Sequence, residues 1–597
     1  MLNTTVNITI NDKKFEVENG ITILEAAKRA NIHIPTLCHF EGKKPIGACR
    51  ICLVEVKGAK DPVAACSTPV GENMQISTRG RELRLARKGV IELLLSEHNG
   101  ECPTCSRNSD CELKALAEEH GVKDLPYSGE KKGGKIDDTT WGLYRDSSKC
   151  IHCRRCIEVC NGVQGVSSIS AQFRGFKTQI GPAFAADLDE VTCVQCGQCA
   201  AVCPVGAISE QSEIESVLSE LENPKKYVVV QTAPAVRVAL GEEFSYPVGT
   251  SVTGKMVSAL KELGFNAVFD TNFTADLTII EEGTELLTRL KDSIVDKKDK
   301  KSPALPMFTS CSPGWIQYVE HFYPDFIKNI STCKSPQQMF GALAKTYYAN
   351  KIGVNPADMV VVSIMPCTAK KAEARREEMF SSGYQDVDYV LTTRELARMI
   401  KQSSIDFQSL PDSQMDSPLG FSSGAADIFG NSGGVMEAAI RTAYELVTGK
   451  ELPVKNLHLA EVAGLKGIKE ASLTITGCKD EWKFFENVTL KVAVAHGLEN
   501  AKELIEKIKK GDLSYHFIEV MTCPGGCIGG GGQPRFTDNH TREKRIAALY
   551  REDEGKKIRK SHDNPDIEKL YKEFLGKPLG NLSHKLLHTH YHKRERV

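Results

Sequence analysis

The stretch Glu519-Val-Met-Thr-Cys-Pro-Gly-Gly-Cys-Ile-Gly-Gly-Gly-Gly-Gln-Pro534 decides the fold around which the rest of the chain is organised. Cys523 and Cys527 are separated by three residues, and glycines occupy positions 529 to 532. Thiolates at that spacing can bind one iron cluster, and residues without side chains let the backbone approach a bulky inorganic group. The stretch therefore predicts a metal-binding loop.

Two segments upstream complete a pattern with this loop. They read Thr309-Ser-Cys-Ser-Pro-Gly-Trp315 and Met365-Pro-Cys-Thr-Ala-Lys-Lys-Ala-Glu373. In this order the three segments resemble the signature of the iron-only ([FeFe]) hydrogenases. The resemblance implies an active site, the H-cluster, that joins a [4Fe-4S] cube to a di-iron unit carrying CO, cyanide and a dithiolate bridge.

Bulk properties narrow the class of protein. The 597 residues are too many for one core, and a formal net charge of -1 gives no argument for binding nucleic acid or an anionic membrane. We see no apolar stretch of about 18 residues and no signal peptide, which predicts a cytoplasmic protein with no membrane insertion. Disulfides are rare in a reducing cytosol, so most of the 21 cysteines are expected to be metal ligands.

The N-terminal 80 residues combine a predicted hairpin with four cysteines. Residues 5–10 and 15–17 alternate apolar and polar side chains around Asn11-Asp12, and a helical pattern follows over 21–30. This order resembles a plant-type β-grasp ferredoxin domain (residues 1–80) holding [2Fe-2S], although the first cysteine gap is longer than in plants. A structural zinc site is the alternative. The expected ligands are Cys38, Cys49, Cys52 and Cys66.

Residues 81–140 carry a second ligand set after a helix predicted over 81–100. The pattern H-x3-C-x2-C-x5-C resembles the His-ligated [4Fe-4S] site of these hydrogenases and of the large iron–sulfur subunit of respiratory complex I. A neutral imidazole in place of a thiolate generally raises the cluster potential. A Cys3His zinc site is the alternative. The expected ligands are His98, Cys102, Cys105 and Cys111.

A duplicated C-x2-C-x2-C-x3-C run marks residues 141–215, after a Gly- and Lys-rich linker predicted over 131–138. In two-cluster bacterial ferredoxins the fourth cysteine of each run ligates the other cluster. The resemblance therefore implies two crossed [4Fe-4S] sets. One set is Cys150, Cys153, Cys156 and Cys203, and the other is Cys193, Cys196, Cys199 and Cys160.

Residues 216–597 are expected to form the H-cluster domain with a helical C-terminal tail. Short β-branched runs, such as 227–230, 360–364 and 492–495, alternate with helical patterns such as 394–401, which predicts α/β architecture. The whole chain is thus expected to be multidomain, α+β and α/β. We find no GxGxxG after a strand and no P-loop, so nicotinamide or flavin chemistry is expected on a partner subunit.

The resemblance also carries over to individual residues around the active site. Cys367, Cys523 and Cys527 match three ligands of the cube, and Cys527 matches the thiolate shared with the di-iron unit. Lys370 matches the lysine beside one cyanide, as burial of an anionic ligand requires. The family often has Ser where Ala235 stands, so one hydrogen bond to the other cyanide is in question. Other residues expected to contact the group are Ala233, Pro234, Ser335, Pro336, Gln337, Met365, Pro366 and Met521.

A proton relay is implied by four further residues. Glu282, Glu285, Arg289 and Ser331 match the family's route from the surface inward, which ends at a cysteine. The two glutamates are three apart on a predicted helix and share a face. Without the resemblance, an exposed helical face would be the simpler interpretation.

The pair Cys311-Ser312 departs from the family, most catalytic members of which have two adjacent cysteines here. Either Cys311 becomes the fourth cube ligand, or Cys311 keeps the terminal relay role and Ser312 or solvent completes the cube. Sulfur suits an iron–sulfur cube, so we favour ligation by Cys311, although the register of residues 313–315 fits the second hypothesis better. Cys333 and Cys478 fall outside every motif and are interpreted as packing residues.

Taken together, the pattern predicts reversible oxidation and production of H2. One [2Fe-2S] and three [4Fe-4S] clusters would relay electrons to ferredoxin or to a flavin- and NAD-binding partner subunit. A non-catalytic electron-transfer subunit of complex I type is one alternative, but it would lack the last three motifs. A regulatory H2 sensor on the same domain is another, which turnover would distinguish.

Overall fold

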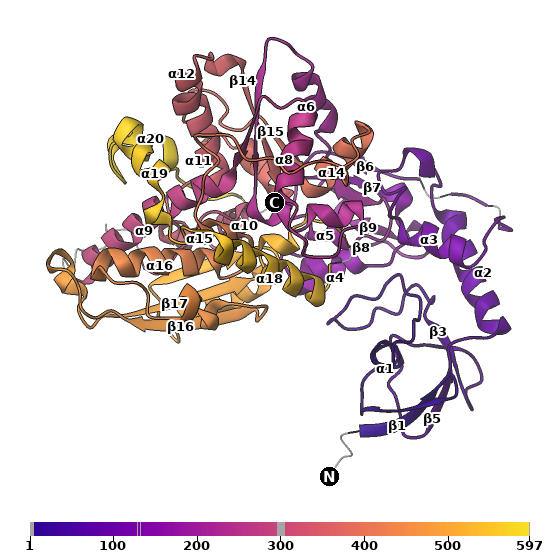
Figure 1. Ribbon diagram of the computed structural model, residues 1–597. Coiled ribbons are helices and arrows are strands. Elements are labelled where there is room, and N and C mark those ends of the chain that lie inside the picture. Colours follow the sequence, from indigo (N-terminus) through magenta and orange to yellow (C-terminus); the bar gives the residue numbers. More distant parts are fainter. Residues whose placement is uncertain (1–4, 128, 132, 295–304, 536, 596–597) are drawn as a thin grey trace.

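A computed structural model describes residues 5–127, 129–131, 133–294, 305–535 and 537–595 (Figure 1). The N-terminal part forms a small domain at one end of the molecule. β1 (Thr5–Ile10) and β2 (Lys13–Glu18) form the predicted hairpin, and Asn11 and Asp12 at its turn have φ values of 48° and 70°. These positive φ values suit the right-handed twist of the hairpin.

The rest of this domain encloses its own core. Its sheet has the order β2-β1-β5-β3-β4, with β3 (Leu53–Val56), β4 (Val63–Ala64) and β5 (Met74–Ser77). α1 (Ile23–Arg29) begins at a capping box formed by Thr22 and Glu25 and buries Ile23, Ala26 and Ala27. α2 (Arg81–Glu97) then leads from this domain to the body of the molecule (Figure 1).

The part of the chain that runs from α3 to β10, here called the ferredoxin-like part, links α2 to the largest domain. α3 (Glu112–Glu119) precedes a three-stranded sheet of order β10-β7-β6, formed by β6 (Ile136–Asp137), β7 (Leu143–Asp146) and β10 (Ile208–Glu210). β6 lies within the predicted linker 131–138, so the linker prediction was wrong there: Ile136 and Asp137 pair with β7. α4 (Arg155–Gly162), α5 (Gln198–Val202) and a hairpin of β8 (Ser170–Gln172) and β9 (Gln179–Gly181) complete the part.

The largest domain contains two four-stranded sheets, which confirms the α/β prediction. The first sheet is parallel, with the order β12-β11-β14-β15. Its strands are β11 (Tyr227–Thr232), β12 (Ala267–Asp270), β14 (Met359–Met365) and β15 (Tyr389–Thr392). All seven residues of β14 are buried, as expected for a central parallel strand covered on both faces.

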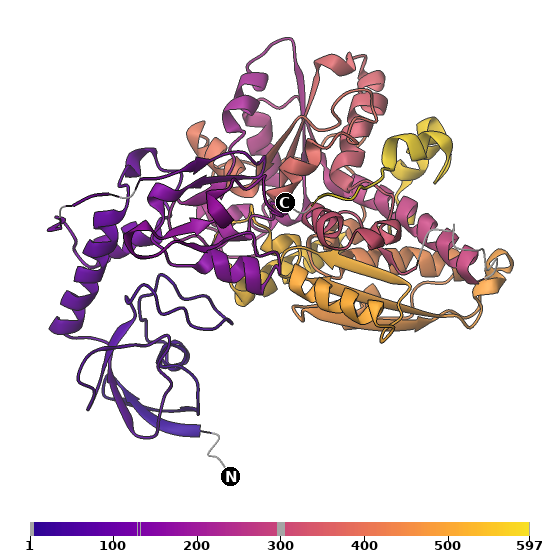
Figure 2. The ribbon, with the colours of Figure 1, turned by 180° about the vertical axis from the view of Figure 1, so that it is seen from behind.

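The second sheet has the order β13-β18-β17-β16, and only β16 runs antiparallel to its neighbour. Its strands are β13 (Met307–Phe308), β16 (Ile468–Thr474), β17 (Thr489–His496) and β18 (Phe517–Met521). The two views of the ribbon show this sheet as a layer separate from the first (Figures 1 and 2).

The long helix α9 (Thr271–Ile294) joins the two layers. Its Phe273 and Leu277 belong to the core around the first sheet, and its Ala275 and Ile279 belong to the core around the second. The main helices that pack around the sheets are α8 (Thr253–Glu262), α10 (Pro313–Phe322), α11 (Pro336–Leu343), α14 (Thr393–Gln402), α16 (Gly434–Thr448), α17 (Leu498–Lys509) and α18 (Asn539–Gly555). The tail ends with α19 (Pro565–Leu570) and α20 (Asn581–Leu587).

The predicted domain boundary at 215/216 falls inside a helix. α6 spans Ile214–Leu221, and its Ile214 and Val217 join the core around the first sheet. A helix that packs on the first sheet therefore crosses the predicted boundary. Among the described residues, no helix is both long and apolar enough to span a bilayer.

Candidate active site and accessory metal sites

The active-site loops all leave strands at their carboxyl ends. β11 ends at Thr232, just before Ala233, and β14 ends at Met365, just before Pro366 and Cys367. β18 of the other sheet ends at Met521, two residues before Cys523. Since ligands in open α/β sheets bind outside the carboxyl ends of strands, this is where a site is expected.

These loops enclose a cavity of about 90 Å³ between the two sheets. Its wall carries Cys311, Ser312, Cys367, Cys523 and Cys527, which come from separate segments of the chain. Most of the predicted contact residues also line it: Ala233, Pro234, Pro336, Gln337, Met365, Pro366, Lys370 and Met521. Ser335 is not among the lining residues, and its hydroxyl donates instead to Glu373 at 2.9 Å.

Glycines let the loop around Cys527 approach its neighbours. A Cβ atom on Gly530 would lie 2.1 Å from the carbonyl oxygen of Pro366, and one on Gly526 would lie 2.6 Å from the amide of Ser432. Gly526 also has a φ of +92°, which side chains disfavour. The glycine run is therefore required for backbone packing as well as for access to the cavity.

Burial shapes the chemistry of the thiols. Loss of solvation raises the pKa of Cys527 to about 12 and also raises the pKa values of Cys367 and Cys523. Several buried thiols converging on one cavity need a cation to become thiolates, and iron supplies that charge. This donor set fits a sulfur-ligated iron group.

Lys370 supplies a cation at the wall of the cavity. Its Nζ lies 2.8 Å from Oε2 of Glu373 and donates to the carbonyl oxygen of Cys311 at 3.1 Å. Glu373 also accepts from the side chain of Gln337 at 3.1 Å. The lysine is therefore held in place by the protein and is not a solvated charge of a helix surface.

The four predicted relay residues are all buried and lie close to one another. Arg289 donates to Oε1 of Glu285 at 2.6 Å, and the hydroxyl of Ser331 donates to Oε2 of Glu285 at 2.9 Å. Ser331 also lies close enough to Glu282 to lower its pKa, and Glu282 in turn lies close enough to Cys311 to raise the pKa of that thiol.

Glu282 is protonated at neutral pH. Burial first, and the nearby Glu285 second, raise the pKa of Glu282 to about 8, against the lowering effect of the bond with Ser331. A buried neutral carboxyl beside a hydroxyl and a thiol can both give and take a proton, which is the property that a relay requires.

Two further cavities each gather four cysteines from the duplicated run. One is lined by Cys150, Cys153, Cys156 and Cys203. The other is lined by Cys160, Cys193, Cys196 and Cys199. The last cysteine of each run thus lies with the first three of the other run. Each grouping offers four sulfur donors at one place, which suits a [4Fe-4S] cube.

The N-terminal cysteines also come together in pairs. The amide of Cys49 donates to Sγ of Cys38 at 3.4 Å, and a hydrogen bond to Cys66 contributes to raising the pKa of Cys52. His98 follows directly after α2 and is 7% exposed. Its Nδ1 has no hydrogen-bond partner among the described residues, which leaves that nitrogen available as a ligand.

Cys196 connects the ferredoxin-like part to the active site, because it lines both its own cavity and the active-site cavity. Close contacts hold the two parts together here. Gln198 donates to the carbonyl oxygen of Gly529 at 2.9 Å, and Thr368 donates to the carbonyl oxygen of Gln195 at 2.7 Å. This cysteine set therefore neighbours the active-site cavity directly.

Sequence reasoning missed several residues of this region. Phe429 lines the cavity from a short 3-10 helix that carries no motif, so no signal pointed to it. Glu373 lies within the segment 365–373, and its spacing of three from Lys370 on a helix could have indicated the pair. Cys333, interpreted as packing, lies 3.9 Å from Oε2 of Glu285.

Comparison with known proteins agrees with this arrangement. Residues 226–531 match the family described as iron only hydrogenase large subunit, C-terminal domain, and residues 539–594 match iron hydrogenase small subunit. Residues 3–81 match a 2Fe-2S iron–sulfur cluster binding domain. Residues 87–126 match the NADH-ubiquinone oxidoreductase-G iron–sulfur binding region, and residues 149–207 match a 4Fe-4S dicluster domain. The chain belongs to the iron-only ([FeFe]) hydrogenase family, as a catalytic subunit with accessory iron–sulfur domains.

Individual relatives cover most or all of the chain. The NADP-reducing hydrogenase subunit HndD of Solidesulfovibrio fructosivorans is 49% identical over 99% of this chain and 100% of its own length. Iron hydrogenase 1 of Clostridium pasteurianum is 39% identical over 98% of this chain and 100% of its own. Among solved structures, the apo [FeFe]-hydrogenase HydA1 of Chlamydomonas reinhardtii matches with a TM-score of 0.57 and 46% identity, over 64% of this chain and 99% of its own.

Proposed function

We propose that the cysteine-lined cavity holds the H-cluster and that the chain there converts H2 reversibly into two protons and two electrons. The observation that carries this proposal is the meeting of two features at Cys311. Cys311 lines the cavity together with Cys367, Cys523 and Cys527. It also neighbours Glu282, which lies beside the hydrogen-bonded series from Arg289 to Ser331.

The bound group would supply the redox metals that exchange electrons with hydrogen. The protein's part is to exclude water and to move protons. Met365, Met521 and Phe429 give the cavity an apolar wall. Glu282, neutral at pH 7, can pass its proton to the thiolate of Cys311 while Ser331 returns one from Glu285.

Cys311 is proposed as the terminal proton donor, which reverses the sequence-based preference for ligation. Its thiol lies in the electrostatic field of Glu282, Lys370 and Cys527, and burial is the main cause that raises its pKa. Ser312 faces a different neighbour, because its hydroxyl accepts from the amide of Thr522 at 3.2 Å and hydrogen-bonds the Thr522 hydroxyl at 2.8 Å. Thr522 directly precedes Cys523, one of the proposed cube ligands, and we propose that Ser312 or solvent completes the cube.

For the accessory sites we propose one [2Fe-2S] and three [4Fe-4S] clusters, with His98 as the imidazole ligand of one cube. Support comes from the two cavities with four cysteines each and from Nδ1 of His98, which is unbonded within the part of the chain that the structure describes. In series, these clusters would connect the buried catalyst to an outside partner.

The electron partners are proposed as ferredoxin and flavin- and NAD(P)-binding subunits of a cytoplasmic complex. Similarity over the full length to a subunit of an NADP-reducing hydrogenase supports this assignment. Because the sequence shows neither a dinucleotide fingerprint nor a P-loop, the nucleotide chemistry is assigned to other chains.

The test uses full-length chain co-expressed with the maturation enzymes that build the H-cluster. We expect H2 evolution from a reduced viologen dye, infrared bands of CO and cyanide, and about 20 iron atoms per chain. Those bands with only slow turnover would support the H2 sensor instead. About 14 iron atoms without the bands, in protein matured under conditions that load a known hydrogenase, would favour a plain electron-transfer subunit.

A further inference from the structure

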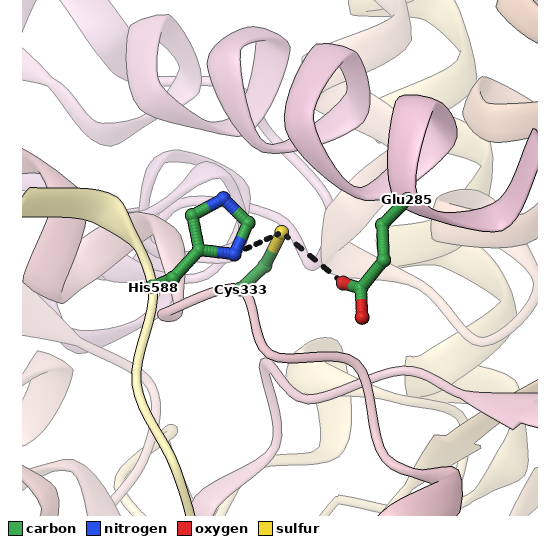
Figure 3. A group of neighbouring side chains, drawn as sticks. All are labelled: Glu285, Cys333 and His588. Atoms are coloured by element: carbon green, nitrogen blue, oxygen red, sulfur yellow. Dashed lines mark hydrogen bonds between the residues drawn. The ribbon is translucent and has the colours of Figure 1, made fainter. Parts of the chain in front are cut away.

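A buried cysteine and histidine adjoin the relay at Glu285 (Figure 3). Sγ of Cys333 lies 3.9 Å from Oε2 of Glu285 and 3.9 Å from Nδ1 of His588. Figure 3 shows the sulfur between the carboxylate of α9 and the imidazole ring of the C-terminal segment. All three side chains are buried, so the contact is a fixed part of the interior.

The other side of the imidazole is anchored on a second carboxylate. Nε2 of His588 lies 3.2 Å from Oε2 of Glu281, which is fully buried. Burial acts to raise the pKa of Glu281, but hydrogen bonds from His588, Ser583 and Tyr571 outweigh it and hold the pKa below its usual range. Glu281 is therefore an anion at neutral pH, and Nε2 of His588 is the donor in this pair.

With Nε2 fixed as a donor, Nδ1 is the nitrogen that can gain or lose a proton. In neutral His588 it accepts, from the hydroxyl of Thr332 at 2.8 Å or from the thiol of Cys333. In protonated His588 it donates to the same groups, and the anionic Glu281 stabilises the positive charge. The ring can thus hold a proton without moving.

We propose that His588 is a proton-holding branch of the relay, which exchanges a proton with Glu285 through the thiol of Cys333. In the forward step, the N–H bond at Nδ1 breaks as that proton passes to Sγ, and the thiol proton passes to Oε2 of Glu285. Imidazolium, thiol and carboxylate become imidazole, thiol and carboxylic acid, so protons and charge balance. This inference rests on the proposed function of the relay.

The branch would suit a reaction that consumes two protons, because one can wait at His588 while another is delivered through Ser331. It also gives the C-terminal region, which matches the hydrogenase small subunit, a direct role beside the large-subunit region. Among the described residues, the titratable groups that face His588 and its hydrogen-bonded partners are Glu281, Glu282 and Glu285 of α9, Cys333, Tyr571 directly after α19, His584 on α20, and Tyr591 of the C-terminal segment.

The experiment compares three variants of the matured full-length enzyme. Cys333→Ala and His588→Gln break the branch, whereas Cys333→Ser keeps a group that can pass a proton. We expect the two breaking variants to lower H2 evolution only about three- to tenfold, because the main route remains intact, and the loss should fade at alkaline pH, where the imidazole no longer carries the extra proton. Cys333→Ser should stay within about twofold of wild type. Unchanged rates and pH profiles in both breaking variants would overturn the branch.

His584→Gln is the matched control. The His584 ring stacks on His588 with centroids 4.8 Å apart, but it is not a member of the hydrogen-bonded series from Glu281 to Glu285. It should leave the rate and the pH profile unchanged. An equal loss in His584→Gln, or in Cys333→Ser, would mean that packing and not proton exchange causes the effect.

A second readout does not depend on turnover. The S–H stretching band of Cys333, assigned by its loss in Cys333→Ala, should shift with pH in wild type as His588 gains a proton, and should not shift in His588→Gln. A band insensitive to pH in wild type would contradict the branch even if the enzyme is active. Absence of H2 turnover in wild type, with the band shift present, would instead count against the proposed function.

Discussion

Ser312 stands at the position where the resemblance to the iron-only hydrogenases leads us to expect a cysteine. The structure gives it a defined place: its hydroxyl is bonded to both the amide and the hydroxyl of Thr522. Cys311, the adjacent residue, lies instead at the relay end of the cavity, near Glu282 and Lys370. Two neighbouring residues that line the same cavity therefore have different surroundings.

Changing Cys311 to Ser tests this division. We expect the infrared bands of CO and cyanide and the iron content to persist, while H2 turnover falls by on the order of a hundredfold or more, because a hydroxyl is a far weaker acid than a thiol. Infrared spectra and dye-linked assays of the matured variant provide the measurement. Disappearance of the bands would make Cys311 a cube ligand.

Ser312→Ala serves as the companion change at the neighbouring position. If Ser312 completes the cube or orders Thr522, the variant should lose cube iron and the infrared bands together. Iron analysis and spectroscopy at equal protein concentration decide the matter. If the variant keeps its full iron content and the infrared bands of CO and cyanide, Ser312 is dispensable and solvent occupies the fourth ligand position of the cube.

At the scale of elements, the ends of β17 and β18 hold the active-site loop against its neighbours. The amide of Gly497, just after β17, donates to the carbonyl oxygen of Met521 at 2.9 Å. His496 ends β17 and lies 3.1 Å from the carbonyl oxygen of Leu465 through Nε2. Burial, followed by the nearby cation Lys469, lowers the pKa of His496 to about 4.

This shift predicts acid sensitivity of the catalytic domain. The unfolded chain binds a proton at His496 near pH 6.5, but the folded chain binds it only near pH 4. The neutral histidine therefore does not reduce the free energy of unfolding above pH 6.5, and that free energy falls as the pH drops from 6.5 toward 4. Lowering the pH from 7 to 5 should reduce the free energy of unfolding by about 2 kcal/mol through His496. Over the same pH range, the reduction in the His496→Gln variant should be smaller by about that amount. Urea unfolding followed at both pH values measures it.

The exposed His540 provides the control for this change. His540→Gln should leave the acid dependence of unfolding as in wild type. If His496→Gln behaves in the same way as His540→Gln, the buried histidine does not set the acid sensitivity.

At the scale of the whole molecule, the ferredoxin-like part and the catalytic domain meet through backbone contacts. A Cβ atom on Gly531 would lie 2.3 Å from the carbonyl oxygen of Cys196 and 2.7 Å from Cα of Gly197. Around this contact, Arg394 and Arg398 form ion pairs with Glu210 at 2.5 Å and 2.7 Å. At this interface the cysteine set that includes Cys196 therefore lies directly against the active-site loop, and residue 531 has no room for a side chain.

Gly531→Ala should force the two parts away from each other. We expect transfer of electrons from reduced ferredoxin to fall on the order of tenfold, because small displacements of reacting groups cost large factors in rate. The measurement is ferredoxin-linked H2 evolution. Gly555→Ala is the control, since a Cβ atom there meets nothing within 4 Å. Equal rates in the two variants would refute the requirement for close contact.

The sequence by itself determined those features that depend on neighbours along the chain. Three such local patterns could be predicted from the sequence alone. They are the ligand spacing in the cysteine runs, the hairpin of β1 and β2 with its Asn11-Asp12 turn, and the alternation of strands and helices after residue 226. Resemblance to a known family extended these patterns to Glu282, Glu285 and Cys367. The prediction of an iron-only hydrogenase was confirmed by the family match and the full-length relatives.

Only the tertiary structure decided which residues from distant segments meet. Cys333 and His588 are 255 positions apart, and Ser312 and Thr522 are 210 apart, so no periodicity relates them. The strand hidden in the predicted linker arises likewise from pairing of Ile136 with Asp146. Such contacts are fixed by the packing of α9, the two sheets and the C-terminal tail, because close packing leaves each buried side chain one set of neighbours.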